Sequence, residues 1–101
     1  MRLFVQEAAE HDILHQIEYY AEQGLSEIAH RFSASVVVSL TFLIENPDIG
    51  SPRHTSDPQL VGLRSWSEKR FEASRIHYLL QPDLLVVVRV LHGKQDTNAL
   101  L

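Results

Sequence analysis

The chain has 101 residues, of which 45% are hydrophobic, so it is long enough for a single domain over residues 1–101. It has no cysteine, which excludes disulfides, thiolate zinc sites and cysteine nucleophiles. Its formal net charge is −4, with two basic and eight acidic side chains in residues 1–50 against seven and five in residues 51–101. Because a net acidic chain lacks broad attraction to phosphate backbones, we expect protein partners and no direct sequence-specific contact with nucleic acid.

The first residues predict a short strand. Leu3, Phe4 and Val5 favour strands and are followed by a polar run. This apolar stretch is too short for a secretory signal, and no segment approaches the roughly 20 apolar residues of a membrane span. We therefore expect a cytoplasmic protein without a membrane partner.

Two helices are predicted to follow as a hairpin. Over residues 7–23 the apolar residues recur at steps of three and four, and Gly24 can end that helix in the left-handed conformation. Ser26 can cap a second helix, which Pro47 prevents from continuing. The three β-branched residues at 36–38 could equally begin a strand, but the length and period of the segment favour a helix.

The second helix has more apolar side chains than one stripe needs. Val37, Val38 and Phe42 widen its apolar face. Either the helix is buried on two sides, or these residues form an exposed groove for a partner.

The second half of the chain predicts a loop and then three strands. Prolines and glycines mark residues 46–62 as a surface loop. Residues 63–67, 75–80 and 84–91 predict strands, and the last is almost continuously apolar, as is typical of a strand covered on both faces. The predicted fold is α+β in the order β-α-α-β-β-β, with the helical hairpin packed on one face of a mostly antiparallel four-stranded sheet.

Charged residues within these strands are the candidate functional residues. Side chains alternate between the faces of a strand, so Arg75 and His77 share one face, which we expect to lie away from the helices. The same alternation could gather Arg64 and Arg89 beside them as a basic cluster. Arginine is suited to bidentate contact with a carboxylate or a phosphate.

Pairing within the chain is the alternative for these arginines. Nearby acids such as Glu68 and Glu72 could neutralise them. Arg89 is the sharpest case, because a charge in an apolar strand must find a partner or an open face.

Other chemistry has little support in the sequence. His11 and His15 lie four residues apart, a spacing at which two imidazoles can share a metal, but solvated surface histidines are the alternative and we predict no metal site. The sequence has no glycine-rich phosphate loop and no nucleophile elbow.

General acid–base cleavage of RNA remains a possible function, since it needs only proton-transfer groups and cations. The residues that could supply them are His77, His92, Arg64, Arg75, Arg89 and Lys94.

Several short motifs resemble the ParE toxin family of the ParE/RelE toxin–antitoxin superfamily. They are GLRSW at 62–66, RIHY at 75–78, VRVLHG at 88–93 and NPDIG at 46–50. Their order and spacing, with the β-α-α opening, extend the resemblance over nearly the whole chain. The family commonly ends in His-Gly-x-Arg-Asp, whereas this chain has Lys94, Gln95 and Asp96 after its His-Gly pair, which moves the positive charge by one position.

The resemblance implies the toxin of a type II toxin–antitoxin system. Such a toxin inhibits DNA gyrase by protein–protein contact, arrests growth, needs no cofactor and no catalytic residue, and is neutralised by a cognate antitoxin. Val37, Val38 and Phe42 then become candidates for antitoxin binding. Trp66 could be a contact anchor or a core residue. The candidates for target binding are Arg64, Trp66, Arg75, His77, Arg89 and His92.

Two further interpretations remain. The first is a ribosome-dependent messenger RNA endonuclease of the RelE type, which has a similar fold. Residues 93–101 contain no tyrosine and no arginine, and the chain is acidic, which favours gyrase inhibition. The second is a homologue that binds its antitoxin without being toxic.

Overall fold

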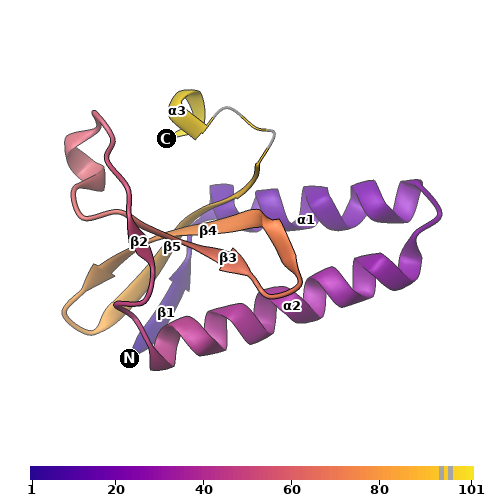
Figure 1. Ribbon diagram of the computed structural model, residues 1–101, viewed down its shortest axis with the longest axis horizontal. Helices are drawn as coiled ribbons and strands as arrows, with labels where there is room; N and C mark the ends of the chain where they lie inside the picture. The colour runs from indigo at the N-terminus through magenta and orange to yellow at the C-terminus, as the bar shows by residue number, and fades with distance from the viewer. Residues whose placement is uncertain (94, 96) are drawn as a thin grey trace.

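A helical hairpin, α1 and α2, lies on one face of a five-stranded sheet (Figure 1). The structure is a computed structural model, and it describes residues 1–93, 95 and 97–101. The elements are β1 (Arg2–Val5), α1 (Glu7–Glu22), α2 (Ser26–Glu45), β2 (Ser51–Pro52), a 3-10 helix η1 (Pro58–Leu60), β3 (Arg64–Glu68), β4 (Phe71–Gln81), β5 (Leu84–His92) and α3 (Thr97–Leu100).

The sheet has the strand order β1-β5-β4-β3-β2, in which β1 runs parallel to β5 and the other neighbours are antiparallel. The predicted α+β class and element order are confirmed, but the four-stranded sheet gains a fifth strand within the predicted loop. This strand, β2, pairs Ser51 with Ser65 and Pro52 with Arg64. Because it lies at the sheet edge, the missing N–H of Pro52 costs no hydrogen bond to a further strand.

The two helices are joined by a tight turn at Gly24. Its φ of +74° is left-handed, as predicted. The N–H of Leu25 donates to the carbonyl of Tyr20, and that of Gly24 to Ala21, which is the Schellman arrangement. The predicted cap at Ser26 is wrong. Leu25, whose N–H donates to Tyr20 in this turn, is the N-cap of α2. Ser26 is therefore the first residue inside the helix.

The described residues form two apolar core clusters, one on each face of the sheet. The larger lies between the hairpin and the sheet, and the smaller lies on the opposite face, here called the second face. The second face is therefore partly covered by apolar side chains. The larger cluster includes Phe32, Leu43, Ile76, Tyr78, Leu85 and Val87. The smaller is built on Leu63, Val86 and Val88, with Leu60, Leu79, Leu84 and Leu101 packed against them.

Helix α2 is long and apolar enough to cross a membrane by length and composition, because it has 20 residues and an 18-residue window within it has a mean hydropathy of 1.3. This differs from the expectation that no segment approaches a span. Its inner face carries core residues such as Phe32 and Leu43, and a core helix meets the same criterion. The apolar composition of α2 therefore arises partly from the core and partly from exposed residues.

Candidate functional site

The predicted basic cluster is divided between the two faces of the sheet. In the β3–β4 register Arg64 lies opposite Tyr78, whose side chain is in the larger core cluster. Arg64 is therefore on the helix side. Arg75 and His77 alternate with Tyr78 and lie on the second face, as predicted. The prediction that Arg64 joins them is wrong, because its cross-strand partner points to the helices.

Arg64 holds the segment that follows α2. Its Nη1 donates to the carbonyl oxygens of Asp48 at 3.0 Å and Gly50 at 2.8 Å. The Tyr78 hydroxyl donates to the Pro47 carbonyl at 2.7 Å and accepts from the Gly50 N–H at 2.9 Å. A Cβ at Gly50 would collide with the Tyr78 ring. Arg64 thus has a structural role, because it fixes the position of residues 47–50 after α2.

Trp66 also lies on the helix side. Its indole stacks on the Phe42 ring, with centroids 5.7 Å apart and planes 22° from parallel, and it packs against the larger core cluster. Trp66 is half-buried. Trp66 therefore packs against Phe42 on α2. It does not lie on the face of the sheet that carries Arg75.

Arg75 lies across β3 on the second face. Its guanidinium donates to the hydroxyls of Ser65 at 3.1 and 3.2 Å and of Ser67 at 2.8 Å. Within the described part of the chain, no carboxylate pairs with it. Its positive charge is therefore held in place without being neutralised.

Arg53 is a second cation on this face, and sequence reasoning missed it. Its N–H donates to the Leu63 carbonyl at 2.8 Å, which continues the pairing of β2, so Arg53 shares the face of Ser51 and of its partner Ser65. The alternation of side chains between the two faces of β2 would have placed Arg53 on the second face. That strand is only two residues long, however, and it was predicted as loop.

His77 is buried, with 1% of its surface exposed, and its Nδ1 has no hydrogen-bond partner among the residues that the structure describes. Burial, the largest cause, together with the positive charges of Arg53, Arg75 and Arg89 lowers the pKa of His77 to about 4, against the opposing effect of Asp12. His77 is therefore neutral at pH 7. The expectation of an exposed contact residue at this position is corrected, because neighbouring side chains cover the ring.

Arg89 is neutralised by Asp12 of α1. Its Nε and Nη2 each donate to the Asp12 carboxylate at 2.7 Å, and the same carboxylate accepts from the Val90 N–H at 3.0 Å. The β1–β5 pairing ends at Val5 and Val87, so Asp12 occupies the place that a longer β1 would take beside Val90. The hydrogen bond with Asp12 raises the pKa of Arg89.

The acids suggested as arginine partners do not serve as such. Glu68 is buried between α2 and β4, where it accepts a hydrogen bond from Ser74 at 3.1 Å and shares the hydroxyl hydrogen of Ser35, at 3.2 Å, with the Lys69 carbonyl. Burial raises the pKa of Glu68 to about 7, against the lowering effect of both serines. Glu72 is exposed and forms no ion pair with any residue that the structure describes.

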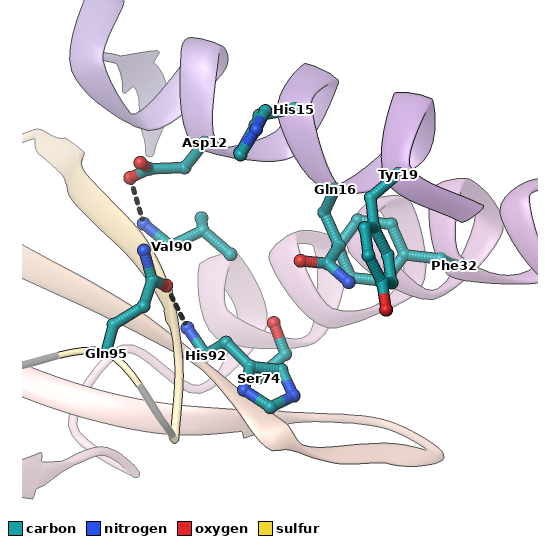
Figure 2. Close-up of a pocket in the computed structure, with 9 residues that line it drawn as sticks. All are labelled: Asp12, His15, Gln16, Tyr19, Phe32, Ser74, Val90, His92 and Gln95. Carbon is teal, nitrogen blue, oxygen red and sulfur yellow. Dashed lines mark hydrogen bonds between the residues drawn. The ribbon is translucent and has the colours of Figure 1, made fainter. Parts of the chain in front are cut away.

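His92 lies in a separate pocket of about 370 Å³ between α1 and the ends of β4 and β5 (Figure 2). It pairs in register with Ser74, which faces the helices, so it is on the opposite side of the sheet from His77. His15 and Tyr19 line the α1 wall of this pocket. The sheet therefore lies between His92 and the residues Arg75 and His77 of the second face.

No metal site is apparent in the described residues. The His11 and His15 rings stack with centroids 6.3 Å apart, but no group of three or more potential ligands comes together in that part of the chain. Lys94, a candidate cation, and Asp96, part of the altered tail, lie outside the described residues.

The widened apolar face of α2 is exposed. Val37 is 63%, Val38 49% and Phe42 39% exposed. Of the two interpretations of these residues, the structure supports an exposed surface on a helix that is buried on one side.

Comparisons with known proteins agree with this architecture. The model of the ParE toxin of the type II toxin–antitoxin system, parDE, matches residues 3–97. The chain is similar to a solved structure described as a chromosomal ParDE TA system from P. aeruginosa, with a TM-score of 0.73 and 17% identity over 91% of this chain and 95% of that one, a likeness that shows the fold. No curated protein sequence matches. Because the family model covers nearly the whole chain, this protein belongs to the ParE toxin family of type II toxin–antitoxin systems.

Proposed function

We propose that this toxin inhibits DNA gyrase by protein–protein contact and does not cleave RNA itself. The observation that carries the proposal is the separation of the two strand histidines. Acid–base cleavage of RNA needs proton-transfer groups and cations around one phosphate. His77 is buried with a pKa of about 4 on one face, and His92 is on the other.

The arginines support the same proposal. Arg64 binds backbone carbonyls on the helix side, and Arg89 is neutralised by Asp12. Arg75 keeps its charge on the second face, with Arg53 on the same side. Acidic side chains of the target would complement this pair of cations.

Replacing Arg75 with glutamine is expected to raise the toxin concentration for half-maximal gyrase inhibition by about tenfold or more, because a charge-assisted contact is lost. The amide can still bond to the hydroxyls of Ser65 and Ser67, so the fold is retained. The measurement is supercoiling of relaxed plasmid at fixed salt, with detection of trapped cleaved DNA. Arg2→Gln is the matched control, since Arg2 is exposed on β1 and should leave inhibition unchanged.

Other outcomes would favour the other interpretations. No inhibition by folded wild-type protein in large molar excess would contradict direct action on gyrase. Cleavage of messenger RNA on translating ribosomes would then support the RelE-type nuclease. Unimpaired growth on expression without antitoxin would support a homologue that is not toxic.

We also propose that a cognate antitoxin neutralises the toxin by covering the exposed residues of α2. Val37, Val38 and Phe42 place apolar surface in water on one helix. Burial of such a surface by a partner is favourable at roughly 25 cal/mol per Å² of apolar area. A disordered antitoxin segment that folds on binding is suited to this kind of contact.

Replacing Val38 with aspartate is expected to weaken antitoxin binding by about tenfold or more, because a carboxylate would have to be desolvated in an apolar interface. Isothermal titration with purified antitoxin provides the measurement. Val61→Asp is the control, since Val61 is an exposed valine on the loop before β3. Unchanged affinity of folded Val38→Asp would contradict the proposed surface.

A further inference from the structure

A groove of about 360 Å³ lies between α2 and the turn that joins β3 to β4. One wall is a helical stripe of α2 that contains Arg31, Ser35 and Val38, at spacings of four and three residues. The other wall is formed by Lys69 and Arg70 of the turn and by Phe71 at the start of β4. The groove thus combines apolar side chains with three cations.

Hydrogen bonds hold the two walls in a fixed arrangement. The Ser35 hydroxyl donates to the Lys69 carbonyl at 2.7 Å, and the Lys69 N–H donates to the Ser39 hydroxyl at 3.1 Å. Arg70 has a φ of +68°, in the left-handed region, which makes the turn sharp. Because the turn is tied to α2, the groove exists before any partner binds, and less ordering is needed on association.

The charge of the groove is opposite to that of the protein. Arg31 lies 3.4 Å from Glu27, but both side chains are exposed, and such a pair contributes little. Neither Lys69 nor Arg70 has an ion-pair partner among the described residues. A positive groove on a chain of net charge −4 selects for acidic groups at this position.

The groove is continuous with the apolar surface of α2. Val38 belongs to both, being 49% exposed on the helix and part of the groove wall. A segment that crosses from that surface into the groove would place apolar side chains on Val38 and Phe71. Its carboxylates would lie beside Lys69 and Arg70.

We infer that this groove receives an acidic, amphipathic segment of the antitoxin, with apolar side chains against Val38 and Phe71 and aspartate or glutamate beside Lys69 and Arg70. The inference rests on the proposed antitoxin contact of α2 and adds an electrostatic component to it. Such a component sets the orientation of the segment and speeds association at low salt.

The test uses Lys69→Glu and Arg70→Glu as single variants, titrated with the intact antitoxin at about 50 mM and about 500 mM salt. Each is expected to weaken binding by about tenfold or more at low salt and to differ less from wild type at high salt. Arg2→Glu changes the net charge by the same amount on exposed β1 and should bind like the wild type. Thermal unfolding of each variant checks that it is folded.

The outcomes separate this inference from the proposal on which it rests. If both turn variants bind like the wild type while Val38→Asp binds weakly, the groove is not used and the α2 contact stands. If Val38→Asp is also unaffected, the proposed antitoxin surface is wrong as well. Restored binding of Lys69→Glu to an antitoxin with one acid changed to lysine would identify the pairing residue and support the inference.

Discussion

Replacing Asp12 with alanine is expected to lower the free energy of unfolding by about 3 kcal/mol. The Asp12 carboxylate accepts hydrogen bonds from two guanidinium nitrogens of Arg89 and from the Val90 N–H. The Arg89 side chain is 20% exposed and that of Asp12 is 9% exposed. Removal of the acid leaves a mostly buried cation and a backbone donor without these partners, which costs more than the loss of a surface ion pair.

Urea denaturation of Asp12→Ala, Arg89→Ala and the double variant would measure this effect and the coupling between the two side chains. Glu18→Ala, an exposed acid of the same helix, should change stability by less than about 0.5 kcal/mol. A loss below about 1 kcal/mol for Asp12→Ala would contradict the structural role of the pair. Because Arg89 stabilises the fold, a loss of toxicity in Arg89 variants indicates target contact only when their stability is unchanged.

Replacing Glu68 with glutamine is expected to stabilise the protein at pH 8 by up to about 3 kcal/mol. Burial raises the pKa of Glu68 from 4.5 to about 7. A group with a raised pKa in the folded state contributes stability below pH 4.5, and that stability is lost as the pH rises through 7. Glutamine stays neutral and avoids this loss, while its amide can still bond to Ser35 and Ser74.

His77 acts in the opposite direction over nearly the same range. Its pKa falls from 6.5 to about 4, so its contribution to stability is present above pH 6.5 and is lost as the pH falls through 4. Between these limits the effects of Glu68 and His77 offset each other. The wild-type profile therefore conceals two buried groups that titrate in opposite senses.

Denaturation from pH 4 to pH 8.5 would separate the two contributions, since each variant removes one of them. Glu68→Gln should lose stability in acid more steeply than the wild type. His77→Gln should lose stability more steeply as the pH rises. Parallel pH profiles for the wild type and both variants would contradict the shifted pKa values. Glu18→Gln again provides an exposed control.

The local elements could be predicted from the sequence alone. The spacing of apolar residues marked both helices, and the left-handed Gly24 marked the turn between them. The almost continuously apolar residues 84–91 marked a strand covered on both faces, and β5 contributes Leu85 and Val87 to one core cluster and Val86 and Val88 to the other. These features were accessible because periodicity, turn chemistry and strand propensity act between residues close in sequence.

The family could also be inferred from short motifs in their order, and the family match over residues 3–97 agrees. The motifs could not show which of their residues contact a partner. The motifs place arginines on strands but do not say what each guanidinium meets across the sheet.

Only the tertiary structure decided the surroundings of the charged residues. Asp12 and Arg89 are 77 positions apart, and they meet because β1 stops short of Val90. Arg64 and Arg75 lie on opposite faces because Arg64 pairs with Tyr78, which is an odd number of residues from Arg75 along β4. In a sheet a shift of one residue moves a side chain to the other face. The partners of these charges therefore depend on register and on long-range packing, which no local pattern contains.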